Sequence, residues 1–370
     1  MSLYILRYHR IRFALLALPA WLLSCLFARN PQLCEQFFSS GFQRFLRDLF
    51  GRFFGLFPFS ISEFFIIFAI ATAIIYLTLI VRKFLLDSEH RSDTLLRFVS
   101  TLFGISGTIY FAFMVFCGYN YQRLTFSEHS GLITRLSSVE ELAGLCTELS
   151  QRANKIRVLL PEDEGGVMAS AFSSHYQTAV YASTAYQNLS DIYPVVGGYT
   201  PRAKPVLLSR GMSYLDITGV YFPFTFEGNI NVDIVPYNIP ATITHELAHF
   251  KGFMREDEAN FIAYLACIHS GNNEYLYSGL MLALIHSTNA LYSADRELCQ
   301  QIQDMWIPGV KADISANNAY WRRFDTPVAT VSTAVNNAYL KANRQEDGVK
   351  SYGHMVDLLL ADYRQRHNID

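Results

Sequence analysis

Two long stretches without a charged residue constrain the fold more than any other feature of this chain. Residues 64–81 and 98–122 contain no Asp, Glu, Lys or Arg over 18 and 25 residues, respectively. About 20 apolar residues let an α-helix cross the hydrocarbon core of a bilayer, so both stretches are expected to span a membrane. Residues 13–28 are uncharged for 16 residues but contain Pro19. A retained first span, a signal peptide and a buried amphipathic anchor all fit this segment, and we expect a retained span.

The segment between the first two expected spans has apolar residues at helical spacing. Over residues 40–55, Phe and Leu form one stripe, and Arg44, Arg47 and Arg52 lie off it. A helix of this kind lies in the membrane interface or packs as an ordinary core helix. We expect the interface.

Basic residues around the spans predict their orientation, because Lys and Arg are enriched on the cytoplasmic side. With three spans, an inside N-terminus places residues 124–370 outside the cytoplasm of a multi-pass protein. The bias is seven against four: Arg7, Arg10, Arg12, Arg82, Lys83, Arg91 and Arg97 against Arg29, Arg44, Arg47 and Arg52.

Composition divides the chain into two parts. Hydrophobic residues make up 51% of it and charged residues 17%, and both biases are strongest in the first third. We therefore interpret residues 1–123 as a membrane anchor and residues 124–370 as one domain with its own core. A net charge of −2 without a basic run argues against a nucleic-acid partner.

The second part is expected to be mainly helical, with a small sheet. Ser138 and Glu141 form a capping box that would open a helix ending near residue 155. From residue 204 to residue 235 the chain has short β-branched and aromatic runs, and residues 205–209 and 219–222 are the expected strands. Further helices are expected over residues 239–252, 256–270, 274–292, 294–303, 327–342 and 351–365.

Residues 275–292 are apolar enough to raise a fourth membrane span. The segment is short for a span and contains His286 and Asn289, which are costly in hydrocarbon. We expect a buried core helix instead.

The motif His245-Glu246-Leu247-Ala248-His249 predicts a zinc site. Two His four apart share one face of a helix. Catalytic zinc takes three protein ligands, with imidazole nitrogens at about 2.0–2.1 Å, and keeps one position for water. His245 and His249 would bind the metal and Glu246 would act on that water. The alternative is a solvent-facing helix that carries two His by chance.

A carboxylate from the following helix is the expected third ligand. Glu256 and Asn260 are four apart and share a helix face, so Asn260 can hydrogen-bond a ligand His while Glu256 binds zinc. Glu258 lies about 200° around the helix from Glu256. We expect Glu256 to be the ligand, with Glu258 as the alternative.

The segment Glu256-x-x-Ala259-Asn260 resembles the second motif of Glu-type zincins, or gluzincins. It is similar to that of HtpX-type membrane metallopeptidases and ImmA/IrrE-type proteases, where the first Glu binds zinc and an Asp or Asn follows four residues later. The spacer between His249 and Glu256 is shorter here than is usual in those families, which keeps Glu258 open as a ligand.

Several segments outside the metal motif also carry a resemblance. They are the three apolar spans and residues 117–121, 219–224, 277–279, 336–343, 347–349 and 351–353. Over nearly its full length the chain thus resembles an uncharacterised family of bacterial membrane proteins, the domain of unknown function 3810. The resemblance implies a metallopeptidase anchored in the bacterial cell membrane, without naming a substrate.

Residues 226–232, just before the metal helix, are a candidate edge strand. Zincins commonly hold an extended peptide against a sheet edge through main-chain hydrogen bonds, and Gly228, Asn229 and Asn231 would contact it here. An ordinary edge strand or loop fits equally well. Glu227 is a further carboxylate that ranks below Glu256 and Glu258 as a ligand.

Four residues after the motif are candidate donors to the oxyanion of the reaction. Each is also typical of an ordinary core or surface position. They are Tyr277, His286, Tyr339 and Tyr352.

The sequence therefore predicts N-terminal transmembrane helices followed by a mainly helical α+β metallopeptidase domain that is zincin-like and has a small sheet. Its cofactor would be Zn²⁺. Its partners would be a peptide or protein substrate and the lipid bilayer. Glu246 would take a proton from the zinc-bound water and return it to the leaving amine. The alternatives are a membrane sensor, or a non-catalytic zinc-binding domain, that recognises an extracytoplasmic peptide or protein.

Overall fold

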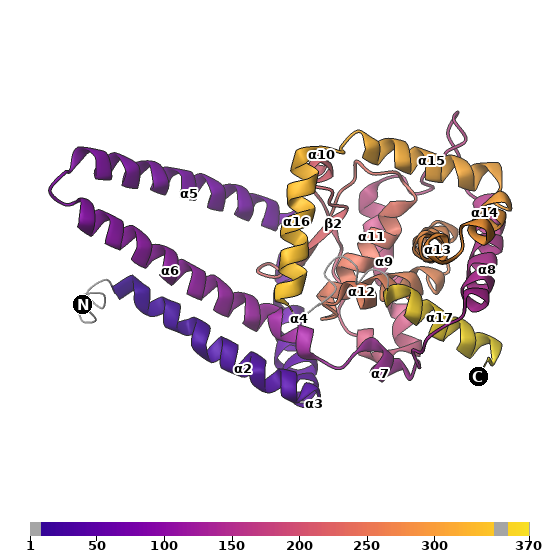
Figure 1. Ribbon diagram of the computed structural model, residues 1–370, viewed down its shortest axis with the longest axis horizontal. Helices are drawn as coiled ribbons and strands as arrows, with labels where there is room; N and C mark the ends of the chain where they lie inside the picture. Colours follow the sequence, from indigo (N-terminus) through magenta and orange to yellow (C-terminus); the bar gives the residue numbers. More distant parts are fainter. Residues whose placement is uncertain (1–8, 344–353, 370) are drawn as a thin grey trace.

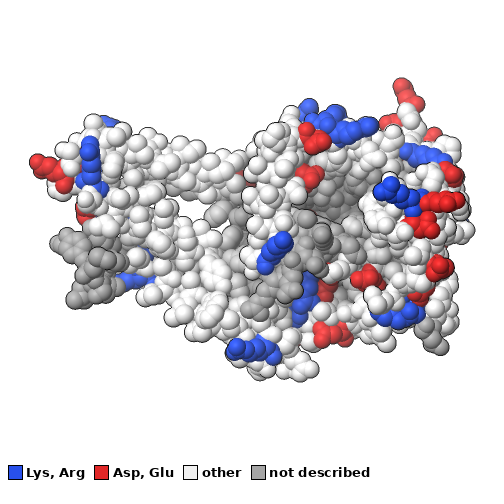
Figure 2. Space-filling view, viewed as in Figure 1, with Lys and Arg blue, Asp and Glu red and all other residues white. Residues whose placement is uncertain are grey.

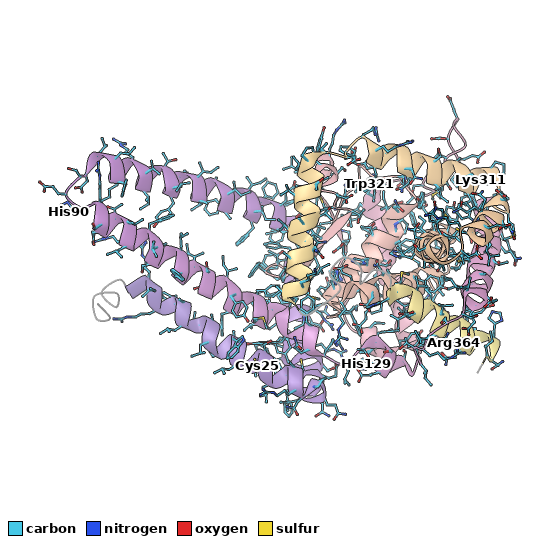
Figure 3. The ribbon with its side chains drawn as sticks, in the orientation of Figure 1. Cys25, His90, His129, Lys311, Trp321 and Arg364 are labelled. Atoms are coloured by element: carbon cyan, nitrogen blue, oxygen red, sulfur yellow. The ribbon has the colours of Figure 1, made fainter. Side chains whose placement is uncertain are left out.

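Three long apolar helices project from one side of a helix-rich body in the computed structural model, which describes residues 9–343 and 354–369 (Figure 1). They cover Arg10–Arg29, Ile61–Leu86 and Arg91–Phe116, and each is long and apolar enough to cross a membrane. The third ends at Phe116, earlier than the expected residue 122. Figure 3 shows His90 at the turn between the second and third helices, far from the body.

The surface of these helices is apolar along their middle. Charged side chains gather at their far tips and over the body (Figure 2), and large side chains such as Phe68 are exposed. A contiguous apolar surface of this size marks contact with a membrane or with another protein. The N-terminal elements are η1 (His9–Leu16), α2 (Ala17–Arg29), α3 (Pro31–Leu33), η2 (Cys34–Phe42), α4 (Gln43–Gly55), α5 (Ile61–Leu86), α6 (Arg91–Phe116) and η3 (Gly118–Gln122).

Helix α4 is amphipathic in the reverse of the usual sense. Its polar residues Gln43 and Arg47 are buried against the body, whereas Phe45, Leu49 and Phe53 are exposed. The helix coincides with the expected interfacial segment 40–55. Arg47, one of the four basic residues counted on the outer side of the spans, is buried in the structure.

The body is built mostly from helices. The capping box at Ser138 is present: the Ser138 side chain accepts from the backbone N–H of Glu141, and the Glu141 side chain accepts from the backbone N–H of Ser138. The expected helix runs to Arg157. The body elements are α7 (Phe126–Ser130), α8 (Val139–Arg157), α9 (His175–Ile192), η4 (Pro194–Val196), β1 (Lys204–Pro205), α10 (Ser209–Tyr214), β2 (Gly219–Phe222), β3 (Glu227–Ile230), α11 (Asn238–Phe250), α12 (Glu256–Ile268), α13 (Asn273–Ala294), α14 (Arg296–Asp304), α15 (Pro308–Arg322), α16 (Pro327–Ala342) and α17 (His354–His367).

The expected helices after residue 238 are present within three residues at their described ends, and four further helices of the body, α7, α9, α10 and α15, were not expected. The strand expected over residues 205–209 is wrong: β1 ends at Pro205, and Ser209 begins α10. Helix α13 is buried along much of its length, so residues 275–292 form a core helix rather than a fourth span.

The small sheet has the order β1-β3-β2. Strand β3 pairs with β1 in parallel and with β2 antiparallel, so the expected edge strand over residues 226–232 is instead the central strand. Asn229 accepts from Ser60 and Ser62 at the start of α5, and Asn231 donates to Ser213. These side chains hold the fold together, and the outer strands of the sheet are β1 and β2.

Many polar contacts join the N-terminal part to the body. Lys204 donates to the backbone carbonyls of Phe54 in the last turn of α4 and of Phe57 and Phe59 after it. The Glu227 carboxylate accepts from the backbone N–H of Ser62 at 2.8 Å, which gives this residue a role at the start of α5 rather than at a metal. The body therefore packs directly onto the ends of the projecting helices.

Candidate metal centre

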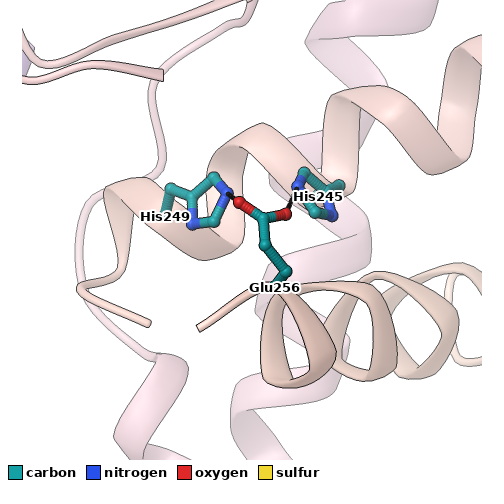
Figure 4. Close-up of side chains that lie close together, drawn as sticks. All are labelled: His245, His249 and Glu256. Atoms are coloured by element: carbon teal, nitrogen blue, oxygen red, sulfur yellow. Dashed lines mark ion pairs between the residues drawn. The ribbon is translucent and has the colours of Figure 1, made fainter. Parts of the chain in front are cut away.

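A tight turn brings the two halves of the candidate site together. Helix α11 ends at Phe250, and Gly252 continues the chain with a positive φ of 92°, a conformation that glycine adopts without strain. Helix α12 then begins at Glu256 and packs against α11. Because Glu256 is the first residue of α12, its side chain lies against the face of α11 that carries the two His (Figure 4).

Three ligand atoms converge between these helices. One ligand atom from each of His245, His249 and Glu256 lies within 4.8 Å of the other two. The Glu256 carboxylate is 3.2 Å from His245 Nε2 and 3.6 Å from His249 Nε2. Two ligands bound at about 2.1 Å in tetrahedral geometry lie roughly 3.4 Å apart, so the separations fit a zinc ion.

The hydrogen bonds of both His rings leave their Nε2 atoms free to bind a metal. His245 Nδ1 lies 2.8 Å from Asn260 Oδ1, and His249 Nδ1 lies 2.8 Å from the Phe253 carbonyl oxygen. With Nδ1–H donated to these oxygens, both Nε2 atoms are acceptors that face a carboxylate. When both rings are neutral, these acceptors converge with the carboxylate on one point, and a donor set of two imidazoles and a carboxylate is one that zinc prefers.

Glu246 lies beside this cluster with an unsatisfied oxygen. The residue is only 3% exposed, and its Oε2 has no hydrogen-bond partner among the described residues. A buried polar atom without a partner is costly and calls for a functional explanation. This carboxylate is therefore available to a water or substrate in the site.

Two glycines make room for Glu246. A Cβ atom at Gly219 would lie 2.4 Å from Glu246 Oε1, and one at Gly228 would lie 2.9 Å from Glu246 Cβ. Gly219 thus places the N-terminal end of β2 directly against the carboxylate. Gly228 lets the central strand pack on α11, rather than approach a peptide as expected from the sequence.

Burial and neighbouring charge shift the pKa values of the metal-free site apart. Burial would lower the pKa of His245, but the hydrogen bond and charge of Glu256 raise it to about 9. Burial lowers the pKa of His249 to about 4. Burial raises the pKa of Glu246 to about 8, against the effect of His245. Opposed shifts among neighbouring groups are typical of acid–base sites.

The structure separates Glu256 from its alternative. Glu258 is buried elsewhere, where its carboxylate accepts from the Phe126 N–H at 2.7 Å and from Arg255 Nη1 at 3.2 Å. Asn260 and Glu256 both contact His245, as expected for two residues on the same face of α12. The structure thus brings Glu256, and not Glu258, together with the two His.

The candidate oxyanion donors lie in different places. Tyr277 is buried in the core and donates to Asp313 Oδ2 at 2.6 Å, and His286 lies partly buried on α13. Tyr352 lies outside the described residues. The Tyr339 hydroxyl is 3.1 Å from that of Tyr121; burial chiefly, and also the charge of Glu256, raises the pKa of both phenols. Tyr339 is linked to the site by packing, because Tyr121 lies in one cluster with Tyr221, whose ring is 6.4 Å from the His249 ring.

Sequence reasoning missed a second buried cluster, at the end of the metal helix. The Lys251 carbonyl oxygen, next to the C-terminus of α11, accepts from Arg47 Nη1 at 3.0 Å and from Arg123 Nη1 at 3.2 Å. Arg123 also donates to both carboxylate oxygens of Glu35, at 2.9 and 2.8 Å. Positive charge at a helix C-terminus is stabilising. No local signal marks this cluster, because its members lie far apart in the sequence.

Comparison with known proteins gives a family. The family model described as "Protein of unknown function (DUF3810)" matches residues 38–360. The chain belongs to the DUF3810 family. No curated protein and no solved structure matches it. The DUF3810 match includes α5, α6 and both helices of the candidate metal centre, and it shows no relationship to HtpX-type or ImmA/IrrE-type proteases.

Proposed function

We propose that this DUF3810 protein is a membrane-anchored, zinc-dependent metallopeptidase with a zincin-like, gluzincin-type domain. The observation that carries the proposal is the convergence of His245, His249 and Glu256 beside the buried carboxylate of Glu246, whose Oε2 has no hydrogen-bond partner in the part of the chain that the structure describes. A structural zinc site is usually closed by four protein ligands. Three ligands and an adjacent base are what hydrolysis requires.

Glu246 is the general base of the proposed reaction. Zinc at this site would supply a Lewis acid that polarises the scissile carbonyl and acidifies water. Glu246 takes a proton from the attacking water and returns it to the leaving amine. Burial raises the pKa of this carboxyl to about 8 in the metal-free protein, and a cation bound beside it would lower that pKa and favour the ionised base. Tyr339 is the proposed donor to the oxyanion.

Strand β2 is the proposed edge for the substrate. It is an outer strand of the sheet; Gly219 lies against Glu246, and the Tyr221 ring is 6.4 Å from the His249 ring. A peptide that adds to this edge by main-chain hydrogen bonds would pass the metal without a strict demand on its sequence. The proposed substrate is therefore an extended peptide or a protein segment.

The proposed anchor consists of three membrane-spanning helices, with the body outside the cytoplasm. The helices at Arg10–Arg29, Ile61–Leu86 and Arg91–Phe116 have the required length and composition. Arg47 is buried and donates to the Lys251 carbonyl, so we leave it out of the count of basic residues beside the spans. The group of four then becomes three, and the basic residues favour this orientation by seven to three.

Hydrolysis of peptides by the full chain tests this function. We expect the detergent-solubilised protein to cleave members of a quenched-fluorescent peptide library, to lose activity on chelation and to regain it with zinc. A protein that holds zinc but cleaves no peptide would contradict the peptidase and favour a zinc-stabilised binding domain or sensor.

A further inference from the structure

Helix α16 has an apolar stripe that faces outwards. Val328, Val331, Val335 and Tyr339 are 43 to 64% exposed, and their spacing of three, four and four residues places them on one face. Leu340 lies roughly on the opposite side of the helix and is fully buried against the molecule. The helix is thus attached mainly through Leu340, the only one of the described residues of α16 that is buried, while its apolar stripe is exposed.

The composition of α16 suits the boundary between water and lipid. Its sequence PVATVSTAVNNAYLKA has no acidic residue and only one basic residue, Lys341. Thr, Ser and Asn fill the positions beside the stripe. Helices that lie in the interface combine an apolar face with a polar one, and Tyr is enriched at the level of the headgroups.

The position of α16 joins its stripe to the projecting helices. Figure 1 shows that α16 lies across the end of the body where α5 and α6 enter it, so it would run along the membrane surface rather than through it. The Tyr339 ring packs on Phe113, near the end of α6, with ring centroids 6.2 Å apart. The face that Figure 2 shows over α16 carries little charge. The stripe is therefore continuous with the apolar surface of α6.

We propose that α16 docks on the bilayer surface through Val328, Val331, Val335 and Tyr339, as a second interfacial helix besides α4. The proposal rests on the proposed membrane anchoring but not on peptidase activity. Because Tyr339 is hydrogen-bonded to Tyr121, and Tyr121 packs in one cluster with Tyr221 beside the His249 ring, the docked helix would also lie near the candidate metal centre. The site would then lie at the level of the membrane surface.

Depth-dependent quenching tests the docking in the full chain. The variants V331C and V335C, labelled with an environment-sensitive fluorophore, are placed in phosphatidylcholine nanodiscs with and without nitroxide-labelled acyl chains. T333C is the matched control, because Thr333 is exposed on the same helix but off the stripe. I74C reports on the anchor, since Ile74 is exposed in the middle of α5. The unsubstituted protein gives the background from its native cysteines.

We expect nitroxide lipids to lower the fluorescence of V331C, V335C and I74C about twofold, and that of T333C by much less. Quenching of I74C without quenching of V331C and V335C would overturn the docking and leave the anchor intact. Equal quenching of T333C and V331C would overturn the proposed face. Excimer formation by pyrene-labelled V331C, without lipid quenching, would show that the face binds a second copy instead. An unquenched I74C would overturn the anchoring, and the docking with it.

Discussion

Two buried polar clusters lie beside α11 and the turn that follows it, and they differ in whether their hydrogen bonds are complete. The neck cluster consists of Glu35, Arg47, Arg123 and the Lys251 carbonyl. In it, the two Arg side chains donate to the Lys251 carbonyl, and Arg123 also donates to the Glu35 carboxylate. In the metal cluster, two imidazole Nε2 atoms face the Glu256 carboxylate, and Glu246 Oε2 has no partner among the described residues. The first cluster is complete within the protein, and the second is not.

The difference separates structural from functional polar chemistry. A buried charge that is fully hydrogen-bonded holds two elements together, and the neck cluster joins α4 and the segment after η3 to the end of α11. A buried acceptor without a donor costs free energy, so its presence indicates a ligand that completes it. We infer that the neck cluster serves stability and the metal cluster serves chemistry.

The largest expected effect is on catalysis by Glu246. Glu246→Gln removes the base while preserving its shape, so kcat/KM for a cleaved peptide should fall about 10³- to 10⁴-fold. Zinc content and Tm should change little, because this carboxylate is not a ligand and has an unpaired oxygen. A variant that retains more than about a tenth of the activity would show that Glu246 is not the base.

The neck cluster should respond in the opposite way. Arg123→Met leaves the Glu35 carboxylate buried without its main partner, which should cost about 3–5 kcal/mol of stability. The measurement is Tm in detergent. Arg135→Met is the control, because Arg135 is 43% exposed in an ion pair with Glu141 and should cost less than about 1 kcal/mol. Equal losses of Tm in the two variants would contradict the structural role.

Crowding at Glu246 gives a smaller effect. Gly219→Ala would put a methyl carbon 2.4 Å from Glu246 Oε1, closer than van der Waals contact allows, so it should displace the carboxylate and lower kcat/KM roughly 10²-fold. Gly211→Ala is the matched control, since its Cβ would approach nothing closer than 3.8 Å. Full activity in Gly219→Ala would show that β2 does not border the working site.

The smallest effect is the pH dependence of zinc binding. In the metal-free protein the pKa of His245 is raised from 6.5 to about 9, so its protonation stabilises the fold below pH 6.5 and this contribution is lost as pH rises through 9. Zinc needs the neutral ring. Between these values the zinc affinity should rise about tenfold per pH unit, measured by competition with a fluorescent chelator. A flat profile over this range would contradict the coupling of His245 to Glu256.

Local periodicity predicted much of the candidate site. The His spacing and the Glu256–Asn260 spacing both follow from a helical turn, and in the structure Asn260 meets His245 as that period requires. The long apolar helices and the capping box at Ser138 are also local signals. These features depend on neighbours within one or two helical turns.

The features that were not predicted depend on distant partners. Strand β3 is central because a two-residue strand at Lys204–Pro205 pairs with it, and so short a strand has no periodic signal. The buried Arg47 donates to a carbonyl that lies 204 residues away in the sequence. Tyr339 meets Tyr121 across 218 residues. Spacing within the sequence carries no information about contacts of this kind.

The metal content of the purified full chain tests the central claim most directly. The body packs onto the N-terminal part through Lys204 and Asn229, so the intact protein is the proper sample. We expect about one zinc per chain by elemental analysis, its loss in His245→Ala and Glu256→Gln, and its retention in Glu258→Gln. Well-folded wild-type protein without zinc, even after zinc is added, would contradict the account. Loss of zinc in Glu258→Gln with retention in Glu256→Gln would contradict the assignment of the third ligand.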